Sequence, residues 1–231
     1  MGRDLDWAGC ANVRDLGGLP TADGGAVRRG ALVRADALSR LTSDGWAALQ
    51  AHGVRTVVDL RNDDELGPDD APRPEGIETV QEPLDGMEDT EFWEQWMGRA
   101  EFGTPAYYRP WLDRFPGRAA RVVAAIARAR PGGVAFHCGI GRDRTGLVSI
   151  LVLALAGVSA EDIAADYERG AGGVAADHVA AVEGFYAREG TSGGELVLAL
   201  LEGFDAEAYL RAGGLEEEDL AGLRARLSGS P

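Results

Sequence analysis

The stretch VAFHCGIGRDRTG, residues 134–146, decides how the rest of the chain is interpreted. It begins with an apolar run typical of a buried strand, and Cys138 stands at the end of that run. A short glycine-containing loop follows, and Arg144 and Thr145 then open an apolar segment typical of a buried helix. The pattern predicts a strand, a tight loop and a helix, with the thiol where the strand ends.

The loop after Cys138 has the composition of an anion-binding site. A helix N-terminus presents unpaired amides and the positive end of a dipole, so it attracts phosphate and favours the thiolate form of a nearby cysteine. Glycine lets the backbone curl so that successive amides converge on one anion. We expect this freedom at both glycines of the loop. The predicted phosphate ligands are Gly139, Ile140, Gly141, Arg142, Asp143 and Arg144.

The side chains in and beside the loop suit phosphoryl chemistry. The planar fork of Arg144 can hold two phosphoryl oxygens. Thr145 is expected to donate its hydroxyl to the sulfur, and His137 to orient the loop through hydrogen bonds of its imidazole. A nucleotide-binding Walker loop needs a lysine, and the chain contains none. Three scattered histidines and one local cysteine do not supply a metal site, so neither metal nor cofactor is expected.

These residues resemble a known family. HCGIGRDRTG, residues 137–146, resembles the phosphate loop of the cysteine-dependent protein tyrosine phosphatases, in particular a bacterial branch with the loop HC-x-x-G-K-D-R-T-G. NVRDLGG at residues 12–18 is similar to the N-F-R-D-L-G-G of that branch, and VVDLR at residues 57–61 to its V-x-D-L-R strand. The final helical segment, with Tyr209 and Leu210, also fits, so the resemblance covers nearly the whole chain. Val13 and Arg142 depart from the pattern.

The resemblance and the residue types imply the same mechanism. The Cys138 thiolate attacks phosphorus, and water hydrolyses the resulting cysteinyl-phosphate. The expected substrate is a phosphotyrosine-containing protein or another phosphate monoester, and the product is inorganic phosphate. A general acid must protonate the leaving oxygen. Two residues compete for this role: Asp143, which is favoured because the branch carries Asp in its loop, and Asp85, which lies where the wider superfamily places its acid.

Other functions stay open on the sequence alone. The branch includes enzymes reported to act on phosphotyrosine, phosphoserine or phosphothreonine, and phosphoinositides, so a lipid phosphatase is an alternative. A phosphate-binding module without hydrolytic activity is another, although such proteins usually lack the cysteine or the arginine. A sulfurtransferase or arsenate reductase also uses a cysteine in an anion loop, but Arg144 and Thr145 at this spacing fit phosphoryl transfer better.

Three residues outside the loop are expected to support it. Arg14 and Asp15 are predicted to form a salt-bridged pair that braces the phosphate loop. Arg61 is expected to pair in the same way with Glu65. Cys10 is expected to be an inert thiol, as a lone cysteine near a terminus usually is.

The chain of 231 residues is long enough for one α/β domain, residues 1–231. Strands are expected around residue 13, at residues 31–33, 54–60 and 77–82, and before Cys138, with helices starting at Thr42 or Ser43 and at residue 117. The half after Cys138 has mostly helical patterns. The predicted fold is a central, mostly parallel sheet flanked by helices, protein-tyrosine-phosphatase-like, with a helical C-terminal half.

Residues 88–114 are unusually rich in aromatic side chains. The segment is predicted to be helical. Two interpretations remain: a stripe packed on the core, or a lid or insertion that forms an aromatic wall over the site.

The formal net charge of −15 argues against nucleic acid and against stable membrane association, because both reward clustered positive charge. A phosphate site must therefore be a local feature of a few arginines and amides. Two cysteines are too few for a disulfide scaffold and fit a reducing compartment. No signal peptide is visible, and the longest apolar run, residues 147–156, is too short to cross a bilayer. The expected location is cytoplasmic.

Overall fold

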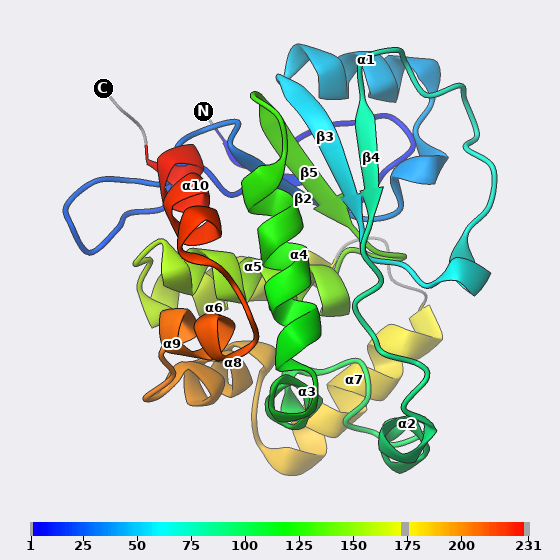
Figure 1. The fold of residues 1–231 in the computed structure, drawn as a ribbon. Helices are drawn as coiled ribbons and strands as arrows, with labels where there is room; N and C mark the ends of the chain where they lie inside the picture. Colours follow the sequence, from blue (N-terminus) through cyan, green and yellow to red (C-terminus); the bar gives the residue numbers. More distant parts are fainter. Residues whose placement is uncertain (1, 172–175, 229–231) are drawn as a thin grey trace.

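A computed structural model describes residues 2–171 and 176–228 of the chain. A five-stranded sheet lies at its centre, with the strand order β1-β2-β5-β3-β4. β1 pairs antiparallel with β2, and the other three pairings are parallel. Helices surround this sheet, so the expectation of a mostly parallel sheet flanked by helices is confirmed (Figure 1).

The elements follow the predicted order. The strands are β1 (Arg14–Asp15), β2 (Leu32–Ala35), β3 (Val54–Asp59), β4 (Glu78–Gln81) and β5 (Gly133–His137). The α-helices are α1 (Ser43–Ala51), α2 (Thr90–Trp96), α3 (Tyr108–Arg114), α4 (Pro116–Arg128), α5 (Asp143–Leu155), α6 (Ala160–Glu168), α7 (Ala176–Glu189), α8 (Gly193–Leu201), α9 (Ala206–Ala212) and α10 (Glu217–Leu227). The 3-10 helices are η1 (Leu38–Arg40), η2 (Asp63–Glu65), η3 (Pro105–Tyr107) and η4 (Arg169–Ala171). The C-terminal half is helical, as predicted.

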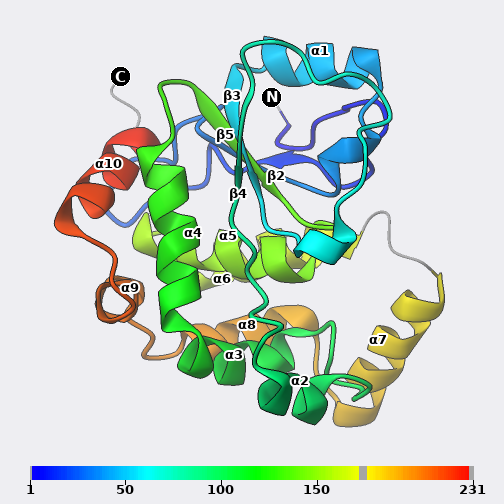
Figure 2. The same ribbon diagram turned by 45° about the vertical axis from the view of Figure 1, so that its right-hand side comes forward.

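The strands β2, β3 and β5 are largely buried on both faces because their side chains alternate between two cores, whereas β4 at one edge is mostly exposed. Leu32, Val134 and Phe136 belong to the larger core, which also contains side chains of α4 and α5. Val33 and Ala135 belong to the smaller core, together with side chains of α1 and of the N-terminal segment. The sheet is thus enclosed between the α4 and α5 layer and the layer of α1, which lies well away from α4 and α5 in both ribbon views (Figure 2).

Local signals explain where several elements begin and end. The side chain of Thr42 accepts a hydrogen bond from the amide of Gly45 and caps α1, as the sequence predicts. Gly53 follows α1 with a φ of +94°, a conformation that glycine adopts at low cost. Because Gly53 turns the chain sharply, β3 begins at the next residue.

The aromatic segment at residues 88–114 forms α2, η3 and α3. Trp93, Tyr107 and Trp111 are buried in the larger core, whereas Phe102 is 39% exposed. The indole nitrogen of Trp111 donates to the carbonyl of Asp85 at 3.2 Å, so the segment also holds the loop that follows β4. Movement of this segment as a lid stays a prediction.

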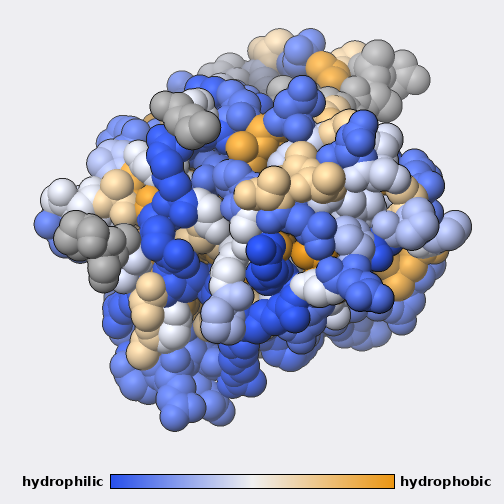
Figure 3. Space-filling model, turned by 90° about the horizontal axis from the view of Figure 1, so that it is seen from above, coloured by the Kyte–Doolittle hydropathy of each residue, from blue (hydrophilic) through white to orange (hydrophobic). Residues whose placement is uncertain are grey.

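The surface seen in Figure 3 is mostly hydrophilic, and its apolar residues form small separate groups. This distribution agrees with the high content of charged residues. Among the described residues, no helix combines the length and the apolar character needed to cross a membrane.

Candidate active site

Cys138 directly follows β5, at the carboxyl end of a central strand of the sheet. The thiol-bearing residue is 1% exposed. Residues 139–142 form a short loop, and α5 begins at Asp143. Ligand sites of open α/β sheets gather at the carboxyl ends of the strands, because helix N-termini and loops meet there. The strand, loop and helix therefore stand in the predicted order at a suitable edge of the sheet.

The carbonyl groups of residues 137–142 are all engaged by donors that belong to the surrounding protein. The donor and acceptor pairs are Leu60 N to His137 O at 2.9 Å, His137 Nδ1 to Cys138 O at 3.1 Å, Ala37 N to Gly139 O at 3.2 Å, Asn12 Nδ2 to Ile140 O at 3.1 Å, Asn12 Nδ2 to Gly141 O at 3.2 Å, Arg34 Nη2 to Gly141 O at 2.9 Å, and Gly146 N to Arg142 O at 2.7 Å. Each backbone carbonyl of residues 137–142 is therefore bound to a donor and directed away from a bound anion.

The amides of the same loop behave in the opposite way. Within residues 2–171 and 176–228, the backbone N–H groups of residues 139–142 donate to no protein acceptor. They are followed directly by α5, which begins at Asp143. Successive unpaired amides are typical of a nest that binds an anion. The backbone of residues 139–142 is thus a row of donors whose carbonyls are bound by other groups.

The two loop glycines play different roles. Gly141 has a φ of +70°, and a Cβ there would lie 2.7 Å from the amide nitrogen of Asp36 and 2.8 Å from the carbonyl of Ala35. Only glycine fits where the loop touches β2. Gly139 has no positive φ, and a Cβ there would make only ordinary contacts at 3.9 Å. The expectation that both glycines are needed for the curl is wrong for Gly139, because the loop is open at that position.

Arg144 lies in the first turn of α5 and reaches over the loop toward two carboxylates. Its Nη2 donates to Glu65 Oε1 at 2.6 Å, and its Nη1 donates to the other oxygen of Glu65. Nη1 also lies 3.0 Å from Asp85 Oδ2. Burial alone would lower the pKa of Arg144, but the hydrogen bonds of Glu65 and the charge of Asp85 raise it. Arg144 is therefore a fixed, permanently charged group above the loop.

Asp85 and Asp143 approach the loop from different elements. Burial, with the nearby charges of Glu65 and Asp143, raises the pKa of Asp85, while Arg144 and a 2.8 Å hydrogen bond from Asn62 oppose the shift. Asp143 is the first residue of α5, and its carbonyl accepts a hydrogen bond from Tyr108 at 3.2 Å. The structure brings both candidate acids to the site, and the pKa of Asp85 is raised above its usual value, chiefly by burial.

Arg142 belongs to the loop by its backbone, but its side chain turns away toward helical tyrosines. The guanidinium carbon lies 5.9 Å from the ring centroid of Tyr167, and Nη2 lies 3.4 Å from the hydroxyl of Tyr186. Arg142 is buried. The predicted phosphate contact of Arg142 can thus come from its amide, while its side chain serves the packing of α6 and α7 beside the loop.

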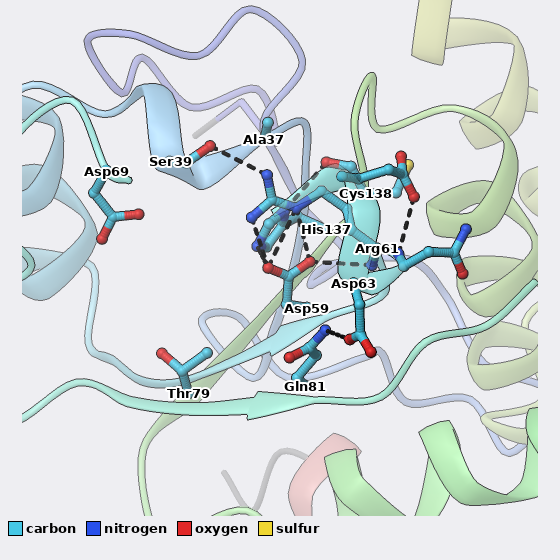
Figure 4. Close-up of polar contacts among 12 residues, drawn as sticks. Ala37, Ser39, Asp59, Arg61, Asp63, Asp69, Thr79, Gln81, His137 and Cys138 are labelled. Carbon is cyan, nitrogen blue, oxygen red and sulfur yellow. Dashed lines mark hydrogen bonds and ion pairs between the residues drawn. The ribbon is translucent and has the colours of Figure 1, made fainter. Parts of the chain in front are cut away.

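Behind the loop, His137 and Asp59 occupy paired positions at the ends of β5 and β3. Figure 4 shows the carboxylate of Asp59 between Arg61 and His137. Arg61 Nη2 donates to Asp59 Oδ2 at 2.7 Å, and His137 Nε2 lies 3.5 Å from that oxygen. Burial lowers the pKa of His137, and Asp59 opposes the shift. The Nδ1 of His137 donates to the carbonyl of Cys138 at 3.1 Å, and the role of His137 in orienting the loop stays a prediction.

Two expected pairings are wrong. Arg14 does not pair with Asp15, because neighbours on a strand point to opposite faces of the sheet. Arg14 Nε instead donates to Asp166 at 2.9 Å, and Asp15 accepts from the amides of Gly17 and Gly30.

The expected pair of Arg61 and Glu65 is also wrong. Arg61 turns back to Asp59, and Glu65 is taken by Arg144. The cause is the end of β3, which places Asp59 two residues before Arg61 while η2 carries Glu65 over the loop.

Thr145 has a different role from the expected one. Its hydroxyl lies 3.4 Å from the carbonyl oxygen of Ala35 on β2, to which it donates, and the residue is fully buried. The first turn of α5 faces β2 at this position, so the hydroxyl ties the helix to the strand. The expected donation to the sulfur of Cys138 is therefore wrong.

Sequence reasoning missed the roles of Asn12, Arg34 and Asp166, and it paired Glu65 with Arg61 instead of with Arg144. Asn12 lies in the NVRDLGG motif, and Arg34 is a charged residue inside the apolar strand ALVRA, so both carried a signal. No sequence pattern pointed to Asp166, because an acidic residue in an amphipathic helix usually faces solvent. Within the described residues, no group of three or more His, Cys, Asp or Glu side chains could hold a metal ion.

Comparison with known proteins gives this site a family. The model of the tyrosine phosphatase family matches residues 5–229. A candidate tyrosine-protein phosphatase of Cupriavidus necator is 34% identical over 170 residues, which cover 71% of this chain and 62% of that protein. The chain thus spans less than two thirds of the Cupriavidus protein.

Two further relatives are matched over more of their length. A tyrosine-protein phosphatase of Nostoc commune is 31% identical over 229 residues, covering 90% of this chain and 78% of that protein. The triple specificity protein phosphatase PtpB of Mycobacterium tuberculosis is 30% identical over 190 residues, covering 70% of this chain and 67% of that protein. The resemblance inferred from the loop and its flanking motifs is confirmed: this chain belongs to the tyrosine phosphatase family.

Proposed function

We propose that this chain hydrolyses phosphate monoesters, with phosphotyrosine in proteins as its main substrate, through a phosphocysteine at Cys138. One observation carries the proposal. The loop after Cys138 has its carbonyls bound by surrounding groups, while the amides of residues 139–142 have no acceptor within the described residues. Such a row of donors at the start of a helix suits a phosphate dianion.

The reaction has two steps. The thiolate of Cys138 attacks phosphorus, the S–P bond forms as the P–O bond to the leaving group breaks, and the leaving oxygen takes a proton from a carboxylic acid. Water then attacks phosphorus, the S–P bond breaks, and inorganic phosphate leaves. The loop amides and Arg144 stabilise the charge on the equatorial oxygens in both transition states.

Asp85 is our choice for the general acid. The raised pKa of Asp85 favours the protonated form that a leaving oxygen requires. Asp85 Oδ2 also lies 3.0 Å from Nη1 of Arg144, the side chain proposed to hold the phosphoryl group. Asp143 stays the second candidate, at the start of α5. After the first step, the carboxylate of the acid can accept a proton from the attacking water.

The charge around the site supports phosphotyrosine over phosphoinositides. A second phosphate group would need a cation beyond Arg144, and the side chain of Arg142 is engaged with Tyr167 and Tyr186. The carboxylates of Glu65 and Asp85 beside Arg144 would repel further negative charge. The relative named as a triple specificity phosphatase supports some breadth among phosphoproteins. With both cysteines free and a net charge of −15, we place the chain in the cytoplasm, away from membranes and nucleic acid.

The test uses the purified chain treated with a chelator. We expect hydrolysis of p-nitrophenyl phosphate and of a phosphotyrosine peptide, and a phosphocysteine at residue 138 after rapid acid quenching. Cys138→Ser should abolish turnover, and Arg144→Ala should lower kcat by about 100-fold or more. Arg114→Ala, which removes an exposed ion-paired arginine of α3, is the matched control and should keep full activity.

The outcomes separate the candidate functions. Wild-type protein that binds phosphotyrosine peptide tightly without releasing phosphate would be a binding module. Faster turnover of phosphoinositide vesicles than of phosphopeptide would favour the lipid phosphatase. Activity that survives in Cys138→Ser would overturn the proposed mechanism.

A further inference from the structure

Asn12 and Arg34 hold the outer side of the phosphate loop together. The Nδ2 of Asn12 lies 3.1 Å from the carbonyl of Ile140 and 3.2 Å from that of Gly141. Arg34 Nη2 donates to the same Gly141 carbonyl at 2.9 Å. We name Asn12 and Arg34 the carbonyl clamp. Both residues are buried, at 4% and 1% exposure, so they do not reach the solvent side of the site.

Asp166 on α6 fixes the clamp from behind. Its Oδ2 accepts from Arg34 Nη1 at 2.7 Å, and its Oδ1 accepts from Arg14 Nε at 2.9 Å and from Arg3 Nη1 at 2.7 Å. The guanidinium of Arg34 therefore spans two fixed points, a carboxylate and the loop carbonyl. The residues come from β2, β1, the N-terminus and α6, which meet only in the folded chain.

The carbonyl clamp binds the two peptide groups that set the direction of the amides of Gly141 and Arg142. A peptide plane has its carbonyl and its amide on opposite sides, so a carbonyl held outward directs the amide of the next residue inward. The carbonyls of Ile140 and Gly141 precede the amides of Gly141 and Arg142. Both amides belong to the row that donates to no acceptor in the described residues.

We propose that Asn12 and Arg34 are positioning residues of the phosphate site, which turn the amides of Gly141 and Arg142 toward the bound phosphoryl group. The inference rests on the proposed function, because the carbonyl clamp is taken to shape the site for the phosphoryl group of the substrate. Arg34 acts through its planar guanidinium, which donates both to Asp166 and to the carbonyl of Gly141. The compact ammonium group of a lysine cannot bridge both acceptors.

The experiment compares Asn12→Ala and Arg34→Lys with the wild-type chain. Asn12→Ala removes the amide donors, and Arg34→Lys keeps the positive charge but loses the fork. The measurements are kcat and KM for p-nitrophenyl phosphate and the inhibition constant of inorganic phosphate. Phosphate binding is measured again as protection of Cys138 from iodoacetamide, which needs no turnover. We expect phosphate to bind about tenfold more weakly in each variant, as for the loss of one charge-assisted hydrogen bond, and kcat to fall.

A control separates positioning from loss of stability. Asp219 is buried on α10 and accepts two hydrogen bonds from Arg128, far from the loop in the fold (Figure 1). Asp219→Asn should lower the thermal midpoint but leave phosphate binding and kcat at wild-type values. A clamp variant that is destabilised in the same way, with unchanged phosphate binding, would show a structural role only and overturn the inference.

The remaining outcomes also decide the question. Wild-type phosphate binding in Arg34→Lys would overturn the role of the fork, because charge alone would then suffice. Should Arg34→Lys not fold, Asn12→Ala decides alone. If wild-type protein hydrolyses no ester but phosphate still protects Cys138, the proposed function fails while the clamp is still tested by the protection assay.

Discussion

Arg144 and Glu65 form a two-point contact in which both terminal nitrogens of the guanidinium donate to the carboxylate. A Cβ on Gly139 would lie 3.9 Å from both Arg144 Nη2 and Glu65 Oε1, so this contact sits directly over the phosphate loop. Glu65 thus holds the fork of Arg144 before a phosphoryl group arrives, and such preorganisation lowers the cost of reaching the transition state.

Glu65→Gln should therefore reduce catalysis more than stability. Glutamine keeps the size of the side chain but offers one acceptor and no charge to the fork. We expect kcat for p-nitrophenyl phosphate to fall about tenfold, while the thermal midpoint changes little because Glu65 is an exposed residue. Asp64→Asn, at the neighbouring exposed position of η2, should have wild-type kcat. An unchanged kcat in Glu65→Gln would contradict the orienting role.

The two candidate acids should differ in their pH profiles. An acid works while it is protonated, so kcat falls as the pH rises through its pKa. The pKa of Asp85 is raised above its usual 3.8, chiefly by burial, and Asp85→Asn should remove this alkaline decline. We expect kcat for phenyl phosphate to drop about 100-fold or more, with a smaller loss for p-nitrophenyl phosphate, whose leaving group needs less protonation.

Asp143→Asn is the matched comparison for Asp85→Asn. It should keep the alkaline decline and lose activity to a similar extent for both esters. The reverse pattern, with the decline lost only in Asp143→Asn, would assign the acid to Asp143 as the loop resemblance suggested.

The loop glycines provide a steric test. Gly141→Ala places a methyl group against the backbone of β2 in a conformation with positive φ, which costs about 1 kcal/mol or more before the clash is relieved. We expect loss of nearly all activity and a lower thermal midpoint. Gly139→Ala meets only ordinary contacts and should keep the fold and a measurable kcat. Equal effects of the two substitutions would contradict the geometry of the loop.

Asp166 should make stability depend on pH. Burial alone would raise its pKa, but Arg34, Arg14 and Arg3 hold the pKa well below its usual 3.8. A carboxylate with a lowered pKa stabilises the fold above its unfolded-state pKa, and this contribution is lost as the pH falls below about 4. Asp166→Asn should destabilise the protein by roughly 3–5 kcal/mol at pH 7, because it leaves buried arginines unpaired.

Urea unfolding at several pH values measures this effect. The wild-type midpoint should fall as the pH drops below about 4, and the midpoint of Asp166→Asn should be lower at pH 7 and flatter over the same acidic range. Identical slopes in the two proteins would show that other carboxylates control the acid sensitivity.

The strand, loop and helix around Cys138 were predictable because each depends on local sequence. The apolar strand and the two glycines lie within 13 consecutive residues, 134–146, and the apolar helix pattern follows directly at residues 147–156. The cap of α1 at Thr42 is equally local, since the capping side chain and the amide it binds lie three residues apart. The mostly parallel sheet followed from the alternation of strands and helices, whereas the order of its strands was not predicted.

Several of the errors concern side chains whose partners are far away in the sequence. Arg14 was paired with its neighbour Asp15, whereas its true partner Asp166 lies 152 residues away. Arg144 was expected to face only the anion, and its contact with Glu65 spans 79 residues. Such pairings depend on how the elements pack, and periodicity in a single sequence does not contain that information.

The carbonyls of Gly139, Ile140 and Gly141 accept hydrogen bonds from Ala37, Asn12 and Arg34, and the carbonyl of His137 accepts one from Leu60. These supports are spread over the first 60 residues of the chain, whereas the loop itself lies beyond residue 137. The motif at residues 137–146 therefore cannot form a phosphate site on its own. A fragment that contains this motif but lacks the N-terminal third of the chain would have the motif sequence without a binding pocket. Loss of enzyme activity on heating should accordingly coincide with cooperative unfolding of the whole domain.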